Sequence, residues 1–207
     1  MKRPHGRQAQ KQATRARILE VARNHFERDG FGEANVRAIA AEADVAAGTV
    51  LLHFTDKLGL LHAALHQDLE IVIEQALRKS SRKTLLNRVC GIVQVFFDYY
   101  ALRPRLSKTL LRESWFAESP WKEQFGEQAL RVSAHMMSLV EAAKANREID
   151  RMADAQLFGT AFLSYYFMAL LVWIQGGGDS PMPFFRSAMG DYISHLKPSG
   201  PRRSART

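Results

Sequence analysis

Apolar residues recur every three or four positions along most of the chain, the spacing that places them on one face of a helix. The first such stripe lies between Thr14, a predicted N-cap, and the pair Asp29–Gly30, which favours a helix end. Its inward members are expected to be Ile18, Leu19, Ala22 and Phe26. Alternating strand patterns are scarce, so the sequence predicts an all-α fold of about nine helices.

The predicted helices fall into two groups separated by the polar stretch 80–83. Before it, two short helices precede a longer one that Asp56 caps and that runs to about Leu77. After it, longer helices are expected over roughly 85–102, 104–115, 120–140, 154–175 and 181–196. The chain is thus expected to divide into a disordered basic arm (1–13), a domain of short helices with its linker helix (14–79), a helical domain (80–196) and a basic tail (197–207).

Composition and cysteine content narrow the class of protein. With 207 residues, of which 46% are apolar and 24% charged, the chain has the balance of a soluble globular protein. Its single cysteine, Cys90, excludes an intrachain disulfide and every multi-cysteine zinc site, as is usual in a reducing cytoplasm. No apolar stretch follows the basic N-terminus, so no secretory signal is expected. We expect a cytoplasmic protein.

The formal charge of +8 is concentrated at the two ends of the chain. Residues 1–17 contain six lysines and arginines and no acidic residue, and residues 197–207 contain four basic residues and no acidic one. A basic arm in front of a folded segment commonly binds a polyanion, because it displaces counterions from phosphates. A solvated, disordered tail has the same composition. Charge alone therefore leaves both interpretations open.

Little in the sequence indicates catalysis or a bound metal. His62 and His66 share a helix face, but Ala63 stands where a metalloprotease helix carries its glutamate. The consecutive glycines at 176–178 fit a break between helices better than a phosphate-binding loop. We therefore expect no catalytic residue, no metal site and no cofactor.

Residues 155–178 carry no charge and are long enough to cross a membrane. Polar or small residues are nevertheless scattered through the run, namely Gln156, Gly159, Thr160, Ser164 and Gln175. A helix that is apolar nearly all round also suits a protein core or a large subunit interface. We favour burial in the protein or in a dimer, and keep a membrane-associated helical protein anchored through 155–178 as the alternative.

The two short helices, Val36–Ala43 and Ala47–His53, have the spacing of a helix-turn-helix. Such helices cross steeply, so their contact must be small and apolar, with Ala40 at the crossing and a wedge of Ile39, Val45 and Val50. Asp44 occupies the first turn position, where a left-handed backbone is expected and aspartate is tolerated. The second helix would project Thr49, Leu52 and His53 outward, and a helix of this width fits the major groove of DNA.

Several motifs in the first third of the chain keep a fixed spacing, namely Asp29-Gly30-Phe31, Val36-Arg37-Ala38-Ile39-Ala40, Val45, Gly48-Thr49, His53-Phe54, Lys57 and Leu60. Through them, residues from about Thr14 to Leu65 resemble the DNA-binding domain of the tetracycline-repressor (TetR) family of bacterial regulators. The resemblance implies an N-terminal three-helix helix-turn-helix DNA-binding domain. It also implies a C-terminal helical domain for ligand binding and dimerisation.

The resemblance also implies which residues contact DNA. Arg37 matches a position that reads a base in some members, and the guanidinium suits that task, although a phosphate contact or a solvated face fits equally well. Thr49 and His53 match recognition-helix positions that touch bases or phosphates. Lys57 matches a lysine that clamps a phosphate near a helix N-terminus. The expected DNA-binding residues are Arg37, Ala47, Gly48, Thr49, Leu51, Leu52, His53 and Lys57.

Leu51 and Leu52 depart from the family pattern, which usually has aromatic residues, often tyrosines, at these positions. Leucine cannot hydrogen-bond a phosphate, so Leu52 is expected to touch a thymine methyl group, or Leu51 to belong to the core. Arg3 and Arg7 of the basic arm are expected to compensate by reaching into the minor groove.

For the C-terminal half, the resemblance implies a small-molecule cavity and a four-helix dimer interface formed by the last two helices of each subunit. The expected interface residues are Phe158, Tyr165, Leu170, Trp173, Phe185, Met189 and Tyr192. The expected pocket residues, for an apolar or aromatic ligand, are Phe96, Tyr100, Trp115, Met136, Phe162 and Tyr166. Each aromatic residue alone fits an ordinary core as well. Glu113 and His135 are expected at the surface rather than as orienting groups.

The implied function is that of a homodimeric transcriptional repressor with double-stranded DNA and a small-molecule effector as partners, and with no membrane. Dimerisation would place two recognition helices about one turn of DNA apart, which predicts a palindromic operator. The effector would release DNA only if it binds the DNA-incompetent arrangement better than the DNA-competent one.

Overall fold

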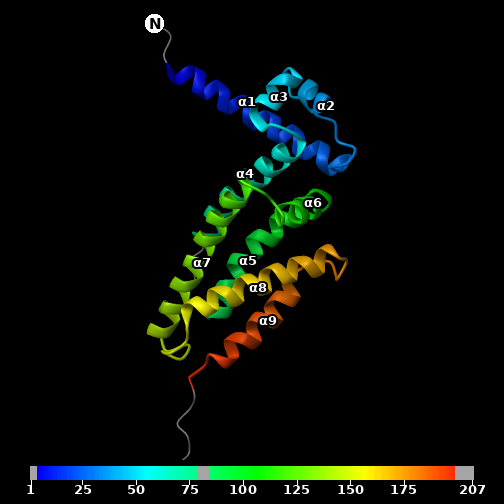
Figure 1. The fold of residues 1–207 in the computed structure, drawn as a ribbon. Coiled ribbons are helices and arrows are strands. Elements are labelled where there is room, and N and C mark those ends of the chain that lie inside the picture. The colour runs from blue at the N-terminus through cyan, green and yellow to red at the C-terminus, as the bar shows by residue number, and fades with distance from the viewer. Residues whose placement is uncertain (1–3, 79–83, 199–207) are drawn as a thin grey trace, which may run out of the picture. The chain divides into compact units, whose positions relative to one another are not determined.

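The computed structural model describes residues 4–78 and 84–198, and every regular element in these two ranges is a helix (Figure 1). The all-α fold predicted from the hydrophobic periodicity is confirmed. Along the chain the helices are α1 (Pro4–Arg28), α2 (Val36–Glu42), α3 (Ala47–Phe54), α4 (Lys57–Leu77), α5 (Leu85–Leu102), α6 (Pro104–Ser114), α7 (Trp121–Ala145), α8 (Ala155–Ile174) and α9 (Met182–His195).

These helices form two compact units. The first unit comprises residues 1–71 and 100–125, and the second comprises 72–99 and 126–207. The predicted boundary at 80–83 lies outside the described residues, and the division falls within α4 instead. The first unit also includes α6, which the sequence analysis assigned to the C-terminal domain.

Contacts with α1 explain why α6 belongs to the first unit. The Arg105 guanidinium donates to the backbone carbonyl of Arg28 at 2.8 Å, which satisfies a carbonyl at the end of α1. The Leu106 amide donates to the Glu27 carboxylate at 2.7 Å. These partners are separated by almost eighty residues, so no local sequence pattern indicates the contact.

Helix α1 buries the predicted apolar stripe and ends where the sequence indicates. Ile18, Leu19, Ala22 and Phe26 are all buried. Gly30 has a φ of 83°, a left-handed conformation that glycine adopts without strain, and its amide donates to the Phe26 carbonyl at 3.1 Å. The predicted helix stop at Asp29–Gly30 is therefore confirmed.

The start of α1 differs from the prediction. The helix begins at Pro4, so residues 4–13 are helical rather than a disordered arm, and Thr14 lies inside the helix rather than at its N-cap. The physical reason is composition, because this segment is rich in glutamine, lysine, alanine and arginine, which favour helix without any buried face. Residues 1–3 lie outside the described part of the chain.

A buried ion pair joins α1 to α4 within the first unit. Arg23 is buried, and its Nε donates to the Asp68 carboxylate at 2.9 Å. A further nitrogen of the same guanidinium donates to the Gln67 side-chain oxygen at 3.2 Å. Since both charged groups are largely withdrawn from solvent and bonded to each other, this pair fixes the position of α1 on α4.

The second unit is built from α8, α9 and parts of α4, α5 and α7. Helices α8 and α9 lie side by side (Figure 1), with Phe158, Phe185 and Met189 completely buried between elements of this unit. Gly159 allows close packing, because a Cβ atom there would lie 2.8 Å from the Ser133 hydroxyl of α7. The Arg88 guanidinium lies 3.0 Å from the Glu148 carboxylate and ties α5 to the segment after α7.

The predicted dimer-interface set requires a correction. Phe158, Leu170, Trp173, Phe185 and Met189 are buried within a single chain, so they belong to the core of the second unit and are not free to contact a second copy. Only Tyr165 and Tyr192 of that set remain half-buried. A helix that is apolar on every side has no periodicity from which to tell its core face from an interface face.

Helix α8 also presents large apolar side chains to solvent, namely Leu157, Phe167 and Met168, and α9 presents Phe184. Among the described residues, α8 is the one helix long and apolar enough to cross a membrane, with only about a third of its apolar window buried. Helices α8 and α9 therefore leave large apolar side chains exposed, which either a second copy of the chain or a lipid bilayer would cover.

Candidate nucleic-acid interface

Helices α2 and α3 form the predicted helix-turn-helix. Asn35 caps α2 by accepting a hydrogen bond from the Arg37 amide at 2.8 Å. The turn after α2 is a Schellman motif, in which the Val45 amide donates to the Ala40 carbonyl at 3.0 Å and the Asp44 amide donates to the Ala41 carbonyl at 3.1 Å. Asp44 has a φ of 51°, so the left-handed conformation predicted for this position is confirmed.

The recognition helix α3 has one buried face and one exposed face. Val50 and Phe54 of α3 are buried in the core of the first unit. Ile39 and Ala40 of α2 are buried there too. The opposite face carries Leu52, which is 86% exposed. Leu51 is 49% exposed, so the alternative that placed it in the core is wrong. The remaining predicted contact residues of α2 and α3, namely Arg37, Ala47, Gly48, Thr49 and His53, are exposed or half-buried.

Lys57 has structural partners in the free chain. Its ammonium donates to the backbone carbonyls of Gly32 at 2.9 Å and Ala34 at 3.2 Å. It also lies 4.8 Å from the centroid of the Phe31 ring, within the range of a cation–π contact. Lys57 therefore holds the loop between α1 and α2, and its phosphate contact stays a prediction.

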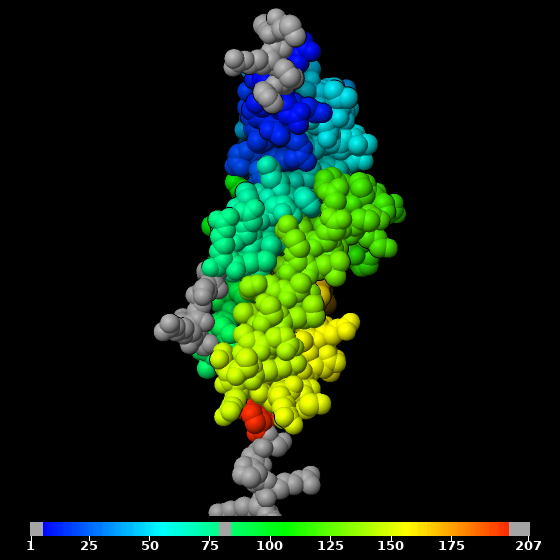
Figure 2. Space-filling view, turned by 90° about the vertical axis from the view of Figure 1, so that its left-hand side faces the viewer, coloured from blue at the N-terminus to red at the C-terminus, as the bar shows by residue number. Residues whose placement is uncertain are grey.

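Helix α1 lies beside the segment that contains the recognition helix (Figure 2, where α1 is blue and α3 cyan). The Arg15 guanidinium lies 5.1 Å from the centroid of the Phe54 ring. Burial lowers the pKa of His53, and the positive charges of Lys11 and Arg15 lower it further. At neutral pH His53 is therefore an uncharged hydrogen-bonding group next to two cations.

The sequence predicts that Arg3 and Arg7 of the basic arm enter the minor groove. Arg3 lies outside the described residues, whereas Arg7 is exposed on helix α1. An arginine on a helix cannot follow the groove as an extended arm does, so the prediction for Arg7 is replaced by a basic helical face that also carries Lys11 and Arg15.

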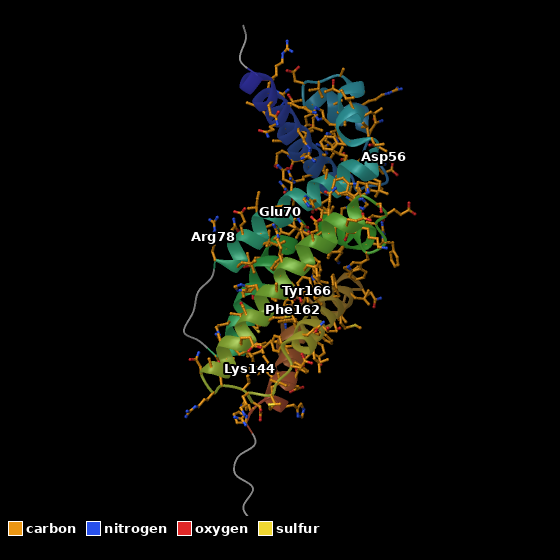
Figure 3. All side chains as sticks on the ribbon, turned by 60° about the vertical axis from the view of Figure 1, so that its left-hand side comes forward. Asp56, Glu70, Arg78, Lys144, Phe162 and Tyr166 are labelled. Atoms are coloured by element: carbon orange, nitrogen blue, oxygen red, sulfur yellow. The ribbon has the colours of Figure 1, made fainter. Side chains whose placement is uncertain are left out.

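The predicted effector-pocket residues are divided between the two units. Phe96, Met136 and Phe162 are buried in the second unit, where the half-buried Tyr166 lies against three phenylalanine rings. Its centroid is 5.9 Å from Phe96, 5.7 Å from Phe97 and 6.1 Å from Phe162 (Figure 3 labels Phe162 and Tyr166). Tyr100 and Trp115 belong to the first unit.

A model for the family described as bacterial regulatory proteins, tetR family, matches residues 18–64, which extend from the buried half of α1 into α4. This segment is therefore similar to the TetR family of bacterial regulators. The regulator UidR from Escherichia coli K12 is 40% identical over 63 residues, 30% of this chain. That match spans 32% of UidR, so this chain spans about a third of the length of the first curated relatives it matches.

Two further similarities extend over most of the chain. The repressor KstR from Rhodococcus jostii is 27% identical over 163 residues, covering 77% of this chain and 72% of KstR. The solved structure of FadR from Bacillus subtilis in complex with stearoyl-CoA superposes with a TM-score of 0.69 at 17% identity, covering 86% of this chain and 97% of that one. At this level of identity the structural likeness shows the fold alone.

Proposed function

We propose that this chain is a DNA-binding transcriptional repressor of the TetR family. The observation that carries the proposal is the two-sided recognition helix, which packs on the first unit through Val50 and Phe54 and exposes Leu52 with its neighbours. A helix held in this way enters the major groove with its outer face towards base edges. The cationic face of α1 beside it supplies contacts to phosphates, which fix the position of the protein on the duplex.

The repressor acts as a homodimer. A recognition helix of eight residues contacts few base pairs, so tight binding requires a second copy. The exposed apolar residues of α8 and α9, namely Leu157, Phe167, Met168 and Phe184, are the surface through which the two copies associate. An isologous dimer places the two recognition helices in symmetric positions, and the operator is then a palindrome. A membrane anchor through α8 would instead require detergent for extraction.

A small apolar or aromatic effector releases the DNA. The ring cluster of Phe96, Phe97, Phe162 and Tyr166 in the second unit supplies the apolar surface for it. FadR from Bacillus subtilis, which has the same fold, binds stearoyl-CoA, and that is consistent with an apolar effector here. The effector acts by binding better to the conformation that does not fit the operator.

Selection from random duplex DNA tests the proposal, followed by equilibrium binding to the selected site at several salt concentrations. We expect a palindrome whose half-sites are about 10 base pairs apart, bound by a dimer, with an affinity that falls as salt rises. Selection of no sequence, or of an unrepeated sequence bound by a monomer, would contradict it. The chain is also expected to stay in the supernatant without detergent, and a need for detergent would favour the membrane alternative.

A further inference from the structure

An open groove of about 680 Å³ lies within the first unit, between the start of α4 and the segment that joins α6 to α7. Asp56, labelled in Figure 3, marks the α4 side, together with Leu58 and His62. The other side is formed by residues 112–121, which include Glu113, Phe116 and Trp121. Its volume lies within the range of small-molecule sites.

His62 offers this groove a buried acceptor. The residue is only 3% exposed, and its Nε2 atom is buried with no hydrogen-bond partner among the described residues. The ring also hydrogen-bonds to the backbone of Glu113, and burial keeps the pKa of His62 below its usual value. The ring is therefore neutral at pH 7, with Nε2 as the acceptor nitrogen. A buried acceptor without a donor is unfavourable, so an N–H group arriving there gains a hydrogen bond.

The surroundings of His62 are aromatic. Its ring centroid lies 5.8 Å from that of Trp121, and the centroids of His62 and Phe125 are also 5.8 Å apart. Phe116 lines the same groove with 84% of its surface exposed to solvent. Phe116 therefore offers an accessible aromatic face to an occupant of the groove.

The charge of the groove is negative. Its lining residues include three carboxylates, Asp56, Glu113 and Glu118, and a single guanidinium, Arg112. That guanidinium is paired, because its Nε lies 3.0 Å from the Glu113 carboxylate. Since His53 and His62 also line the groove in their neutral forms, the groove attracts cations and repels anions.

We propose that the groove is a binding site for a protonated aromatic amine. The aromatic ring of the amine stacks on Trp121 and Phe116, and one ammonium N–H donates to the Nε2 atom of His62. The positive charge lies among the three carboxylates and against aromatic faces, where cation–π attraction adds to the charge attraction. This site is separate from the ring cluster of the second unit, because all its lining residues belong to the first unit.

The groove also includes the junction between the recognition helix and α4. Thr55 has φ 65° and ψ −57°, and the Asp56 amide donates to the Phe54 carbonyl at 2.7 Å, which defines a strained γ-turn. Gly59 permits the turn, since a Cβ atom there would lie 2.2 Å from the Phe54 carbonyl oxygen. Phe54, Thr55 and Gly59 all line the groove, so an occupant contacts the junction that holds α3. If the proposed DNA binding holds, occupation of the groove therefore changes affinity for the operator.

Calorimetric titration of the full chain, without DNA, tests the site itself. The probe is 2-phenylethylamine, and its matched controls are 2-phenylethanol, which is neutral, and 3-phenylpropionate, which is an anion. We expect the amine to bind about 10-fold more tightly than either control, the ratio that corresponds to one charge-assisted hydrogen bond. Equal affinities for the amine and the alcohol, or no binding of the amine, would overturn the proposal.

Substitutions distinguish the contribution of the His62 acceptor to amine binding from that of the negative charge of the groove. His62→Phe keeps an aromatic ring without the acceptor and should weaken amine binding about 10-fold. Glu118→Gln, at an exposed position, should weaken amine binding about 3-fold and leave alcohol binding unchanged. Glu127→Gln makes the same charge change on α7 outside the groove and should have no effect. Equal responses of Glu118→Gln and Glu127→Gln would contradict the assignment of the charge.

Operator binding at saturating 2-phenylethylamine tests the coupling. We expect the amine to weaken operator binding, and saturating operator DNA to weaken amine binding by the same factor, as linkage requires. An amine that binds without changing operator affinity would overturn the coupling but not the site. A chain that binds no DNA would refute the proposed function, while the DNA-free titration would still decide whether the site exists.

Discussion

Replacing Lys57 tests the role that the structure gives this side chain. Its ammonium donates two hydrogen bonds to the carbonyls of Gly32 and Ala34, and it lies over the ring of Phe31. A hydrogen bond from a charged donor contributes about 1.5–3 kcal/mol, and an exposed cation–π contact about 0.5–1 kcal/mol. Because the side chain is half-exposed, solvent screening reduces these contributions. For Lys57→Met, which keeps the apolar stem, we expect the free energy of unfolding to fall by about 2 kcal/mol.

Urea denaturation at pH 7 measures this loss. Lys122→Met is the matched control, because Lys122 is an exposed lysine of the first unit, and it should change stability by less than about 0.5 kcal/mol. Equal stabilities of Lys57→Met and the control would refute the structural role. The salt dependence of operator binding then separates the two roles, because loss of a phosphate contact lowers the slope by about 1 and loss of a purely structural tie does not.

Three further predictions concern the turn, the dimer and pH. Asp44→Ala should lower the free energy of unfolding by about 1 kcal/mol in thermal melts, because alanine resists the φ of 51°, whereas Asp44→Gly should not, and equal losses would contradict this. Phe158→Ala should lower the free energy of unfolding by about 3–5 kcal/mol, because it truncates a core side chain. Met168→Ser should instead shift the chain towards monomer in sedimentation. A monomer produced by Phe158→Ala but not by Met168→Ser would return Phe158 to the dimer interface. Burial lowers the pKa values of His53, His62 and His135 in the folded chain, so the unfolded chain binds more protons as the pH falls through about 6.5, and stability should decline there. His62→Phe should flatten that decline, and an unchanged slope would contradict it.

The helix-turn-helix could be predicted from the sequence because its determinants are local. The left-handed residue Asp44, the small residue Ala40 and the apolar Val50 lie within a few positions of one another, and each has a single structural role. The end of α1 at Gly30 is local in the same way. The buried and exposed faces of α3 then follow from helical spacing, apart from Leu51 at the edge between them.

The features that could not be predicted are those that rest on contacts between distant residues and those whose sequence has no hydrophobic periodicity. The pairing of α6 with α1 joins residues almost eighty positions apart, so neither sequence segment reveals it alone. Because the sequence of α8 is apolar throughout, it does not indicate which side chains are buried. In the structure Phe158 and Leu170 are buried, whereas Leu157 and Met168 are exposed. The extension of α1 to Pro4 could not be predicted, because a run of basic residues is equally typical of a disordered segment.

The groove on the first unit could not be predicted from the sequence, because its two sides are distant along the chain and its residues follow no regular pattern. Glu113 is expected from the sequence at the surface, whereas the structure places it with Phe116 and Trp121 in a groove beside the start of α4. One sequence signal was available, because residues 113–121, at the junction of two predicted helices, include three aromatic and two acidic residues. Its partner His62, about fifty residues earlier, could be assigned only from the fold.

The central claim, that α3 lies in the major groove, is tested most directly by cleavage of DNA from a reagent attached to the recognition helix. Leu52→Cys provides the attachment point at an exposed position, and Cys90, the one native cysteine, is buried and therefore protected from labelling. An iron chelate there should cut the selected operator at two positions about 10 base pairs apart, one in each half-site. The same chelate at the exposed position 152 of the second unit, introduced by Met152→Cys, serves as the control. Two localised cuts from α3 and none from the control would bear out the account. Uniform or absent cutting from α3, or localised cutting from the second unit, would contradict it.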